Sequence, residues 1–378
     1  PYIEAVRQLK WELGNRCLVI HLTLLPFLST TGELKTKPTQ HSVKLLLESG
    51  VQPDILVCRA EHHINKDIRR KIALFCNVAP EAVIEACDAS TIYEVPLFME
   101  KEHLDQIVLK KLGMEPGEEA KMDAWKEFLH KLKNPKKEVR IGLIGKYVEL
   151  KDSYKSIAEA FIHAGVVNEC KVKLDWIHSE TLTEENIGEK LKDLKGILVA
   201  PGFGSRGIEG KILAIKYARE KNVPFLGICL GMQCAVIEYA RHVLNLKDAH
   251  SREMNPATSS PVIDMMEAQK DISHMGGTMR LGSYPCRLEE GTLVQKIYDK
   301  ENINERHRHR YEFNNEYRKQ FTEAGMVLSG INPNAGLVEI VELPGHPFFV
   351  GVQFHPEYKS TVEKPHPLFT HFVKVAMN

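Results

Sequence analysis

Short apolar stretches alternate with longer segments whose apolar residues recur at helical spacing. In the first third of the chain, the pattern predicts strands at residues 17–25, 54–58 and 82–85. It predicts helices at residues 1–13, 40–49 and 64–75. Helices that alternate with buried strands are typical of a parallel sheet covered by helices.

The same alternation starts again at Val139. Strands are expected at residues 139–144, 171–177, 196–200 and 223–228, and helices at residues 153–164, 183–194, 210–219 and 232–239. After Gly276 strands dominate, at residues 278–281, 308–313, 338–341 and 348–354. This order predicts a doubly wound α/β domain, whose functional sites lie at the carboxyl ends of strands.

A charged amphipathic helix within residues 116–138 ends at a proline and separates the two patterns. We interpret it as a linker, although a peripheral helix of the first domain would look the same. The predicted fold is therefore α/β, with two doubly wound domains at residues 1–115 and 139–378. The first enters its pattern in mid-course, without an opening strand and loop.

Composition narrows the classes of function. The 378 residues contain 50 Lys and Arg and 50 Asp and Glu, so the net charge is zero and no nucleic-acid or membrane partner is expected. No apolar run is long enough to span a bilayer, and no secretory signal is recognisable, so we expect a cytoplasmic protein. The eight cysteines form no CxxC pair, which favours reduced, buried thiols, with Cys229 as the exception.

Cys229 lies in Gly-Ile-Cys-Leu-Gly (227–231), between a predicted buried strand and a predicted helix. This is the thiol counterpart of the G-x-S-x-G nucleophile elbow. The start of the helix favours a thiolate, and the next backbone N–H can donate to an oxyanion. The alternative is a buried cysteine at a tight turn.

A general base is expected at the end of another apolar strand, in Gly-Val-Gln-Phe-His-Pro-Glu (351–357). Pro356 favours an extended conformation at His355, and alternate residues of extended chain share a face. Glu357 is then placed to orient the imidazole. Cys229, His355 and Glu357 are the predicted nucleophile, base and orienting carboxylate.

A glycine-rich turn, Pro-Gly-Phe-Gly-Ser-Arg-Gly (201–207), follows a third predicted strand. Such a turn offers backbone donors to a carbonyl oxygen that becomes negative, although an ordinary loop is the alternative. With GICLGMQ and GVQFHPE, it resembles the class I glutamine amidotransferases from Val139 to the end of the sequence. The resemblance implies glutamine hydrolysis through a γ-glutamyl thioester, with release of ammonia.

Three more segments narrow the resemblance to the CTP synthase family: GELKTKPTQHS (32–42), GGTMRLG (276–282) and RHRHRYE (306–312). As a strand, RHRHRYE places three arginines on one face and two histidines on the other. The resemblance implies that residues 1–115 are the C-terminal half of an amidoligase domain of the P-loop type. It further implies ATP-dependent amination of UTP to CTP with glutamine-derived ammonia. It also implies Mg²⁺ as cofactor, GTP as activator, CTP as feedback inhibitor and a homotetramer.

The resemblance also assigns ligand sites. Glutamine is assigned to Gly202, Leu230, Gly231, Met232, Gln233, Glu253 and Arg310. The phosphates of UTP or CTP are assigned to Lys35, Thr36, Lys37, Pro38, Thr39, Gln40 and Lys71. The ATP adenine is assigned to Cys87, Asp88 and Ala89.

Two departures from the family pattern matter. Pro201 stands where the family commonly has glycine, and a proline has no N–H, so an oxyanion donor must come from Gly202 or from the elbow. The sequence also contains no G-x-x-x-x-G-K-[ST] or family-type phosphate loop, and no counterpart of the family's magnesium-binding acids. These 378 residues are therefore expected to keep only the glutaminase chemistry, with no metal site of their own.

Two other functions are compatible with the same motifs. GICLGMQ and HPE are shared by all class I amidotransferases, so another ammonia acceptor is one alternative. A non-catalytic binding or filament module built on the same fold is the other, and the intact cysteine, histidine and glutamate argue against it.

Overall fold

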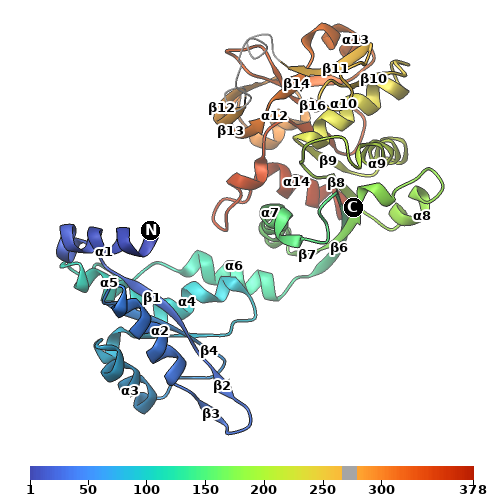
Figure 1. Ribbon diagram of the computed structural model, residues 1–378. Helices are drawn as coiled ribbons and strands as arrows, with labels where there is room; N and C mark the ends of the chain where they lie inside the picture. Colours follow the sequence, from blue (N-terminus) through green and yellow to red (C-terminus); the bar gives the residue numbers. More distant parts are fainter. Residues whose placement is uncertain (266–278) are drawn as a thin grey trace. The chain divides into compact units, whose positions relative to one another are not determined.

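The computed structural model describes residues 1–265 and 279–378 (Figure 1). The chain divides into two compact units, Pro1–Leu129 and His130–Asn378. The division falls inside helix α6 (Asp123–Lys133). Each unit has hydrophobic cores of its own, and each is described separately below.

The first unit is built on a three-stranded parallel sheet in the order β1-β4-β5. Its strands are β1 (Ile20–Leu25), β4 (Ile55–Ala60) and β5 (Val83–Cys87). Its helices are α1 (Tyr2–Leu13), α2 (Lys37–Glu48), α3 (Lys66–Cys76), α4 (Val95–Lys101) and α5 (Leu104–Lys111), and a short hairpin pairs β2 (Phe27–Leu28) with β3 (Glu33–Leu34). One core joins the sheet to α2 and α3, and another joins it to α4 and α5.

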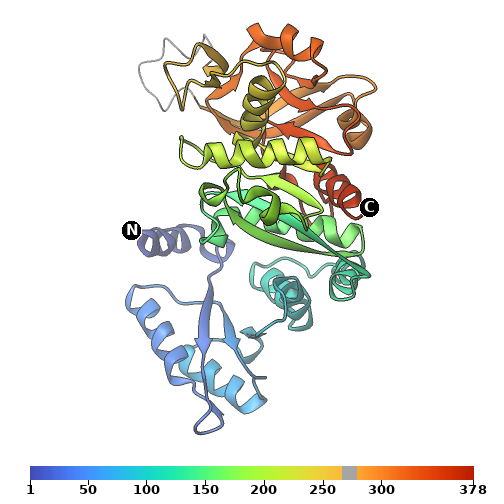
Figure 2. The same ribbon diagram turned by 90° about the vertical axis from the view of Figure 1, so that its right-hand side faces the viewer.

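The second unit, coloured from green to red in Figure 2, contains a mixed sheet. This sheet has nine strands in the order β13-β12-β15-β16-β17-β9-β8-β6-β7. The parallel part comprises β6 (Lys137–Gly145), β7 (Cys170–His178), β8 (Gly196–Val199), β9 (Phe225–Ile228) and β17 (Phe349–Val352). The antiparallel part comprises β12 (Arg280–Leu288), β13 (Asn302–His309), β15 (Val327–Ile331) and β16 (Val338–Glu342). The predicted α/β class, with a parallel sheet extended by antiparallel strands, is confirmed.

Two helical layers cover this sheet. Helices α7 (Lys155–Val167) and α14 (Pro367–Ala376) share one core with it, and α9 (Ile208–Lys221) and α10 (Leu230–His242) share the other. The remaining elements are α8 (Ile187–Leu191), α12 (Leu293–Tyr298) and α13 (Arg318–Glu323), together with a small sheet of β10 (Ala249–Ser251), β11 (Ser260–Met265) and β14 (Tyr311–Phe313). Within the two described ranges, no helix is long and apolar enough to cross a bilayer.

Some predicted boundaries were wrong for local reasons. The helix expected at 183–194 is confined to Ile187–Leu191, because the Asn186 side chain accepts the Thr183 amide at 3.0 Å and closes a turn. The strand expected at 308–313 is interrupted at Arg310, which lies between β13 and β14. Gly276, Gly277 and Thr278 of the GGTMRLG segment lie outside the described residues, and β12 begins at Arg280.

Candidate active site

Cys229 is the single residue between strand β9 and helix α10. Its backbone has φ 52° and ψ −102°, a conformation that is costly for a residue with a side chain. The turn also needs its two glycines. A Cβ atom on Gly231 would lie 2.2 Å from the carbonyl oxygen of Val199, and one on Gly227 would lie 2.7 Å from the carbonyl carbon of Gly231. The predicted sharp elbow is present, and the strand and helix approach closely on either side of it.

The neighbouring strand brings His355 to the same edge of the sheet. Strand β17 runs parallel to β9 with Val352 opposite Ile228, and the Cys229 amide donates to the Val352 carbonyl at 2.7 Å. The chain leaving β17 therefore passes beside the elbow. The His355 amide then donates to the carbonyl of Arg306 at 2.8 Å, which ties this segment to β13.

Glu357 contacts His355 from a 3-10 turn rather than from extended chain. The turn comprises Pro356–Lys359, and His355 has φ −111° and ψ 85°. Nδ1 of His355 lies 2.8 Å from Oε1 of Glu357, and both side chains are almost fully buried. The expected contact between the two residues is thus present, although the local backbone differs from the expected one.

The electrostatics favour a charged imidazole. Burial by itself lowers the pKa of His355, but its interactions with Cys229 and Glu357 outweigh burial and raise the pKa to about 10. Glu357 holds Nδ1, so the interaction with Cys229 is through the buried Nε2, which meets no hydrogen-bond criterion with any other group in the described part of the chain. This nitrogen is therefore free to exchange a proton with a reacting group, while Nδ1 is held by Glu357.

A small pocket opens at the elbow. Its lining residues are Gly202, Phe203, Cys229, Gln233, Glu253, His309, Arg310 and Tyr311. Five of them were named from the sequence, and they come from segments far apart in the chain: Gly202, Cys229, Gln233, Glu253 and Arg310. By contrast, Leu230, Gly231 and Met232 are buried in the first turn of α10 and do not line this pocket.

Side chains hold the glycine-rich turn from two directions. The Gly204 amide donates to Oε1 of Glu253 at 3.1 Å, and the Lys146 ammonium donates to the carbonyl of Phe203. Glu253 therefore supports the turn as well as lining the pocket.

The strand with the alternating arginines and histidines has the expected two faces as far as His309, whereas Arg310 lies outside the strand. Arg306 and Arg308 are exposed, whereas His307 and His309 are buried. Burial lowers the pKa of His307 to about 3 and that of His309 well below its usual value, so both rings are neutral at pH 7. His309 lines the pocket, and the neutral ring leaves Arg310 as the cationic group of this wall.

In the first unit, helix α2 begins within the KTKPTQ segment, with Pro38 in its first turn. Lys35 forms an ion pair with Glu33 at 2.6 Å, and this contact, with a weaker contribution from Lys71, lowers the pKa of the Glu33 carboxyl. Lys35 and Lys71 thus lie near one carboxylate at this end of the helix.

The two threonines of this segment, Thr36 and Thr39, form hydrogen bonds within the protein. Thr39 is buried, and its hydroxyl donates to the carbonyl of Leu24 at 2.9 Å. The side-chain amide of Gln40 donates to the Thr36 hydroxyl at 3.1 Å. Lys37 is exposed on the first turn of α2.

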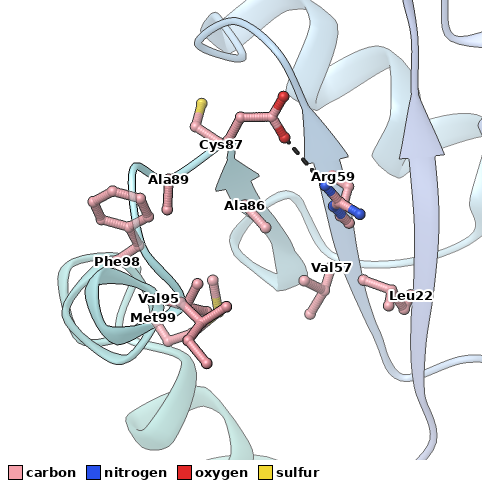
Figure 3. Close-up of a pocket in the computed structure, with 11 residues that line it drawn as sticks. Leu22, Val57, Arg59, Ala86, Cys87, Ala89, Val95, Phe98 and Met99 are labelled. Carbon is pink, nitrogen blue, oxygen red and sulfur yellow. Dashed lines mark hydrogen bonds and ion pairs between the residues drawn. The ribbon is translucent and has the colours of Figure 1, made fainter. Parts of the chain in front are cut away.

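Cys87, Asp88 and Ala89 line a larger cavity of about 640 Å³ at the end of β5 (Figure 3). Apolar side chains from two sides face it: Leu22, Val57 and Ala86 from the sheet, and Val95, Phe98 and Met99 from α4. Arg59 lies at its rim and pairs with Asp88 at 3.2 Å.

Comparison with known proteins agrees with this geometry. Residues 149–375 match the family described as glutamine amidotransferase class-I, and residues 1–114 match the one described as CTP synthase N-terminus. A CTP synthase from Christiangramia forsetii is 63% identical over 377 residues, which cover 100% of this chain and 69% of that protein. The chain belongs to the CTP synthase family. A Bacteroides fragilis CTP synthase is 57% identical, with 100% of this chain and 71% of that protein covered.

A solved CTP synthase structure matches the second unit. The glutaminase domain of the Trypanosoma brucei CTP synthase, with bound acivicin, aligns with a TM-score of 0.60 and 37% identity. The alignment covers 63% of this chain and 94% of that domain. As a CTP synthase family member with a class I amidotransferase domain, the chain is an enzyme of the glutamine-hydrolysing ligases.

Two residues inside the quoted CTP synthase motifs were not identified as site residues from the sequence. Gln353 is fully buried, and its Nε2 lies 3.7 Å from Sγ of Cys229, directed at the sulfur as a donor. The backbone carbonyl of Tyr311 accepts a hydrogen bond from the side-chain Nε2 of Gln233 at 3.0 Å. This contact holds the Gln233 side chain in the pocket wall. Gln353 lies inside the GVQFHPE motif, two residues before His355. This short spacing was the signal that could have identified Gln353 as a site residue.

Proposed function

We propose that the second unit hydrolyses glutamine to glutamate and ammonia, with Cys229 as nucleophile, His355 as acid and base, and Glu357 as the orienting carboxylate. One observation carries the proposal: the elbow cysteine lines a pocket while its neighbour His355 is held at Nδ1 by Glu357 and has a pKa raised to about 10. A cysteine beside a protonated imidazole reacts as a thiolate near neutral pH.

The reaction then has two balanced halves. The Cys229 sulfur attacks the side-chain carbonyl carbon of glutamine, and His355 gives its Nε2 proton to the departing nitrogen. Ammonia is released, and a thioester between Cys229 and the substrate remains. In the second half His355 takes a proton from water, the resulting hydroxide cleaves the thioester, and the carboxylic acid formed loses its proton to solvent. The thiolate and the imidazolium are regenerated.

Negative charge on the carbonyl oxygen has two candidate donors. Pro201 has no N–H, so the glycine-rich turn contributes the amide of Gly202, and the elbow contributes the amide of Leu230 at the start of α10. Gly202 lies close to the elbow, since a Cβ atom on it would be 3.4 Å from the Leu230 side chain.

The pocket also has charges that suit a free amino acid. Glu253 and Arg310 line it with opposite charges, which match the α-ammonium and the α-carboxylate of glutamine. Nε of Arg310 is buried and has no hydrogen-bond partner within the described residues. A buried donor of this kind normally has a partner, and the substrate carboxylate is a suitable one.

We infer further that the family reaction, ATP-dependent amination of UTP to CTP, consumes this ammonia. Residues 1–115 then belong to the amidoligase domain, 116–138 to the linker and 139–378 to the glutaminase. Three features of the first unit support phosphate and base binding: the lysines at the start of α2, Lys71 near them, and the apolar cavity beside Cys87, Asp88 and Ala89. GTP activation, inhibition by CTP and a homotetramer belong to the same proposal.

Within residues 1–265 and 279–378, no group of three or more His, Cys, Asp or Glu side chains is arranged to hold a metal ion. The steps proposed for glutamine hydrolysis use only protein groups and water, and none is routed through Mg²⁺.

The decisive experiment compares two cysteines of the same segment. Cys229→Ala should abolish ammonia release from glutamine, whereas Cys234→Ala, one turn along α10, should retain it. Cys234 is fully buried, burial raises the pKa of its thiol to about 12, and it does not line the pocket. Glutaminase activity in the Cys229→Ala protein would refute the proposed nucleophile.

A further inference from the structure

Lys211 is a buried cation on helix α9 that the proposed reaction does not use. Its side chain is completely inaccessible, and it makes no ion pair within the part of the chain that the structure describes. The residues three before and four after it in α9, Ile208 and Ile215, lie on the same side of the helix and are buried and apolar. An apolar side chain would fill this space without the cost of burying an amine, so the lysine calls for a polar explanation.

The polar contact of Lys211 is at the end of strand β8. Its Nζ donates to the carbonyl of Ala200 at 2.8 Å. The Ala200 amide still continues the parallel ladder, since it donates to the carbonyl of Ile144 at 2.9 Å. In a continued ladder the Ala200 carbonyl would accept the amide of Lys146, but that amide donates to the Tyr154 hydroxyl at 3.2 Å instead. Lys211 therefore supplies the Ala200 carbonyl with the hydrogen bond that a continued strand pair would have provided.

This replacement occurs directly before the glycine-rich turn. The turn begins at Pro201, and the position that a Cβ atom on Gly202 would occupy lies 3.9 Å from Nζ of Lys211 and 3.6 Å from Cε of Lys146. Lys146 in turn binds the carbonyl of Phe203. Two buried ammonium groups thus hold the carbonyls on either side of Gly202.

We propose that Lys211 is a positioning residue of the glutaminase reaction, which holds the Ala200 carbonyl so that the Gly202 amide is presented to the substrate oxygen. The inference rests on the proposed glutamine hydrolysis. Pro201 supports this proposal, because it has no N–H and the turn therefore depends on the orientation of the Gly202 N–H.

The ionisation of Lys211 is consistent with this role. Burial is the main cause that lowers the pKa of Lys211, to about 8; Cys234 and Cys229 oppose this shift and Lys146 adds to it. Among the described residues, these three side chains are the titratable groups that act on the amine. At pH 7 the amine is charged and holds the carbonyl by a charge-assisted hydrogen bond, which weakens when the proton is lost.

The test replaces Lys211 with an apolar side chain of similar volume. Lys211→Met should lower kcat for glutamine hydrolysis by about tenfold to a hundredfold, with KM within about threefold, because the contact matters most for the oxyanion. Alkylation of Cys229 by iodoacetamide needs no oxyanion donor, so its rate should stay within about threefold of wild type. Lys221→Met removes an exposed lysine from the same helix and should change neither rate.

Two results would overturn the role of Lys211: an unchanged kcat in a folded Lys211→Met protein, or an equal fall of hydrolysis and alkylation, which would place its effect on the thiolate. If the variant does not fold, the wild-type protein decides. Its ratio of glutamine hydrolysis to alkylation should fall above about pH 8, and a flat ratio up to about pH 9.5 contradicts the proposal. Absence of wild-type glutaminase activity would instead refute the underlying function.

Discussion

Oε1 of Glu357 lies 2.8 Å from Nδ1 of His355, and both groups are buried at the carboxyl end of the same strand. The contact fixes which imidazole nitrogen faces Cys229. It also sets the charge of the ring, because the pKa of His355 in the folded protein is raised to about 10 despite burial.

Glu357→Gln should keep the hydrogen bond and remove the charge. We expect kcat to fall by about tenfold or more with a modest change in KM, because the carboxylate matters most while the imidazole is charged. The alkaline limb of the kcat/KM profile should move from near pH 10 toward neutrality, by about one unit or more. Glu363→Gln, an exposed change in the same loop, is the control. A variant that keeps its kcat but loses glutamine affinity would make Glu357 a substrate contact.

The same pair predicts a pH dependence of stability. The folded-state pKa of His355 lies above the ordinary value of about 6.5, so protonation favours the folded state. This contribution is fully present below about pH 6.5 and is lost progressively as pH rises to about 10. In Glu357→Gln the loss should be complete at a lower pH, which chemical denaturation at a series of pH values would show. Parallel curves for the two proteins would contradict this account.

Gly231→Ala should disrupt the elbow. The new Cβ would lie 2.2 Å from a backbone oxygen of Val199, at the end of β8, so strand or helix must shift. We expect a loss of about 1–3 kcal/mol in the free energy of unfolding and a marked fall in glutaminase rate. Gly188→Ala is the matched control, because Gly188 is helical and a methyl group added to it would meet no atom within 4 Å. Equal behaviour of the two variants would show that the close approach is unimportant.

Arg280→Met should lower the free energy of unfolding, because it leaves two buried acids without their cationic partner. Arg280 donates to Glu312 and to Glu339, each at 2.9 Å, and all three side chains are buried. We expect a loss of about 3–5 kcal/mol at neutral pH. Burial raises the pKa of Glu312 to about 8 and that of Glu339 above its usual value even with Arg280 present. Without the arginine both pKa values should rise further, so the stability lost as pH rises above about 5 should exceed that of the wild-type protein and should continue above about pH 8. A pH-independent loss would argue against this explanation.

Lys37→Met should weaken UTP binding by about tenfold, because the ammonium at the start of α2 is expected to contact phosphate. Lys44→Met, an exposed lysine later on the same helix, should leave affinity unchanged. Calorimetric titration at two salt concentrations would measure both. Equal affinities for the two variants would remove Lys37 from the phosphate site.

A preparation of these 378 residues should release ammonia from glutamine but make no CTP when UTP, ATP, Mg²⁺ and ammonia are supplied. The reason is that the sequence holds no phosphate-loop motif, whereas the glutaminase motifs are all present. Separate assays of ammonia and CTP would measure the two reactions. CTP formation would overturn our account of where ATP is bound.

Much of the site could be predicted because its parts are short and local. An elbow such as GICLG needs glycines at fixed offsets from the nucleophile, and His355 and Glu357 are two residues apart, so each element is visible as a string of letters. Hydrophobic alternation likewise indicated the α/β class, since every buried parallel strand must be apolar along its length. The backbone that joins His355 to Glu357 was nevertheless wrong in detail, because Pro356 starts a 3-10 turn.

The sequence by itself thus determined the chemical groups and the order of the elements that carry them. The tertiary structure alone decided which distant groups meet. Strand β17 pairs with β9 although the two lie far apart in the sequence, and only this pairing brings His355 to Cys229. Lys211 looks like any helical lysine in the sequence, and its contact with Ala200 exists because the β6–β8 ladder ends one rung early. Such contacts depend on hydrogen bonds between separate elements, which no local pattern of residues encodes.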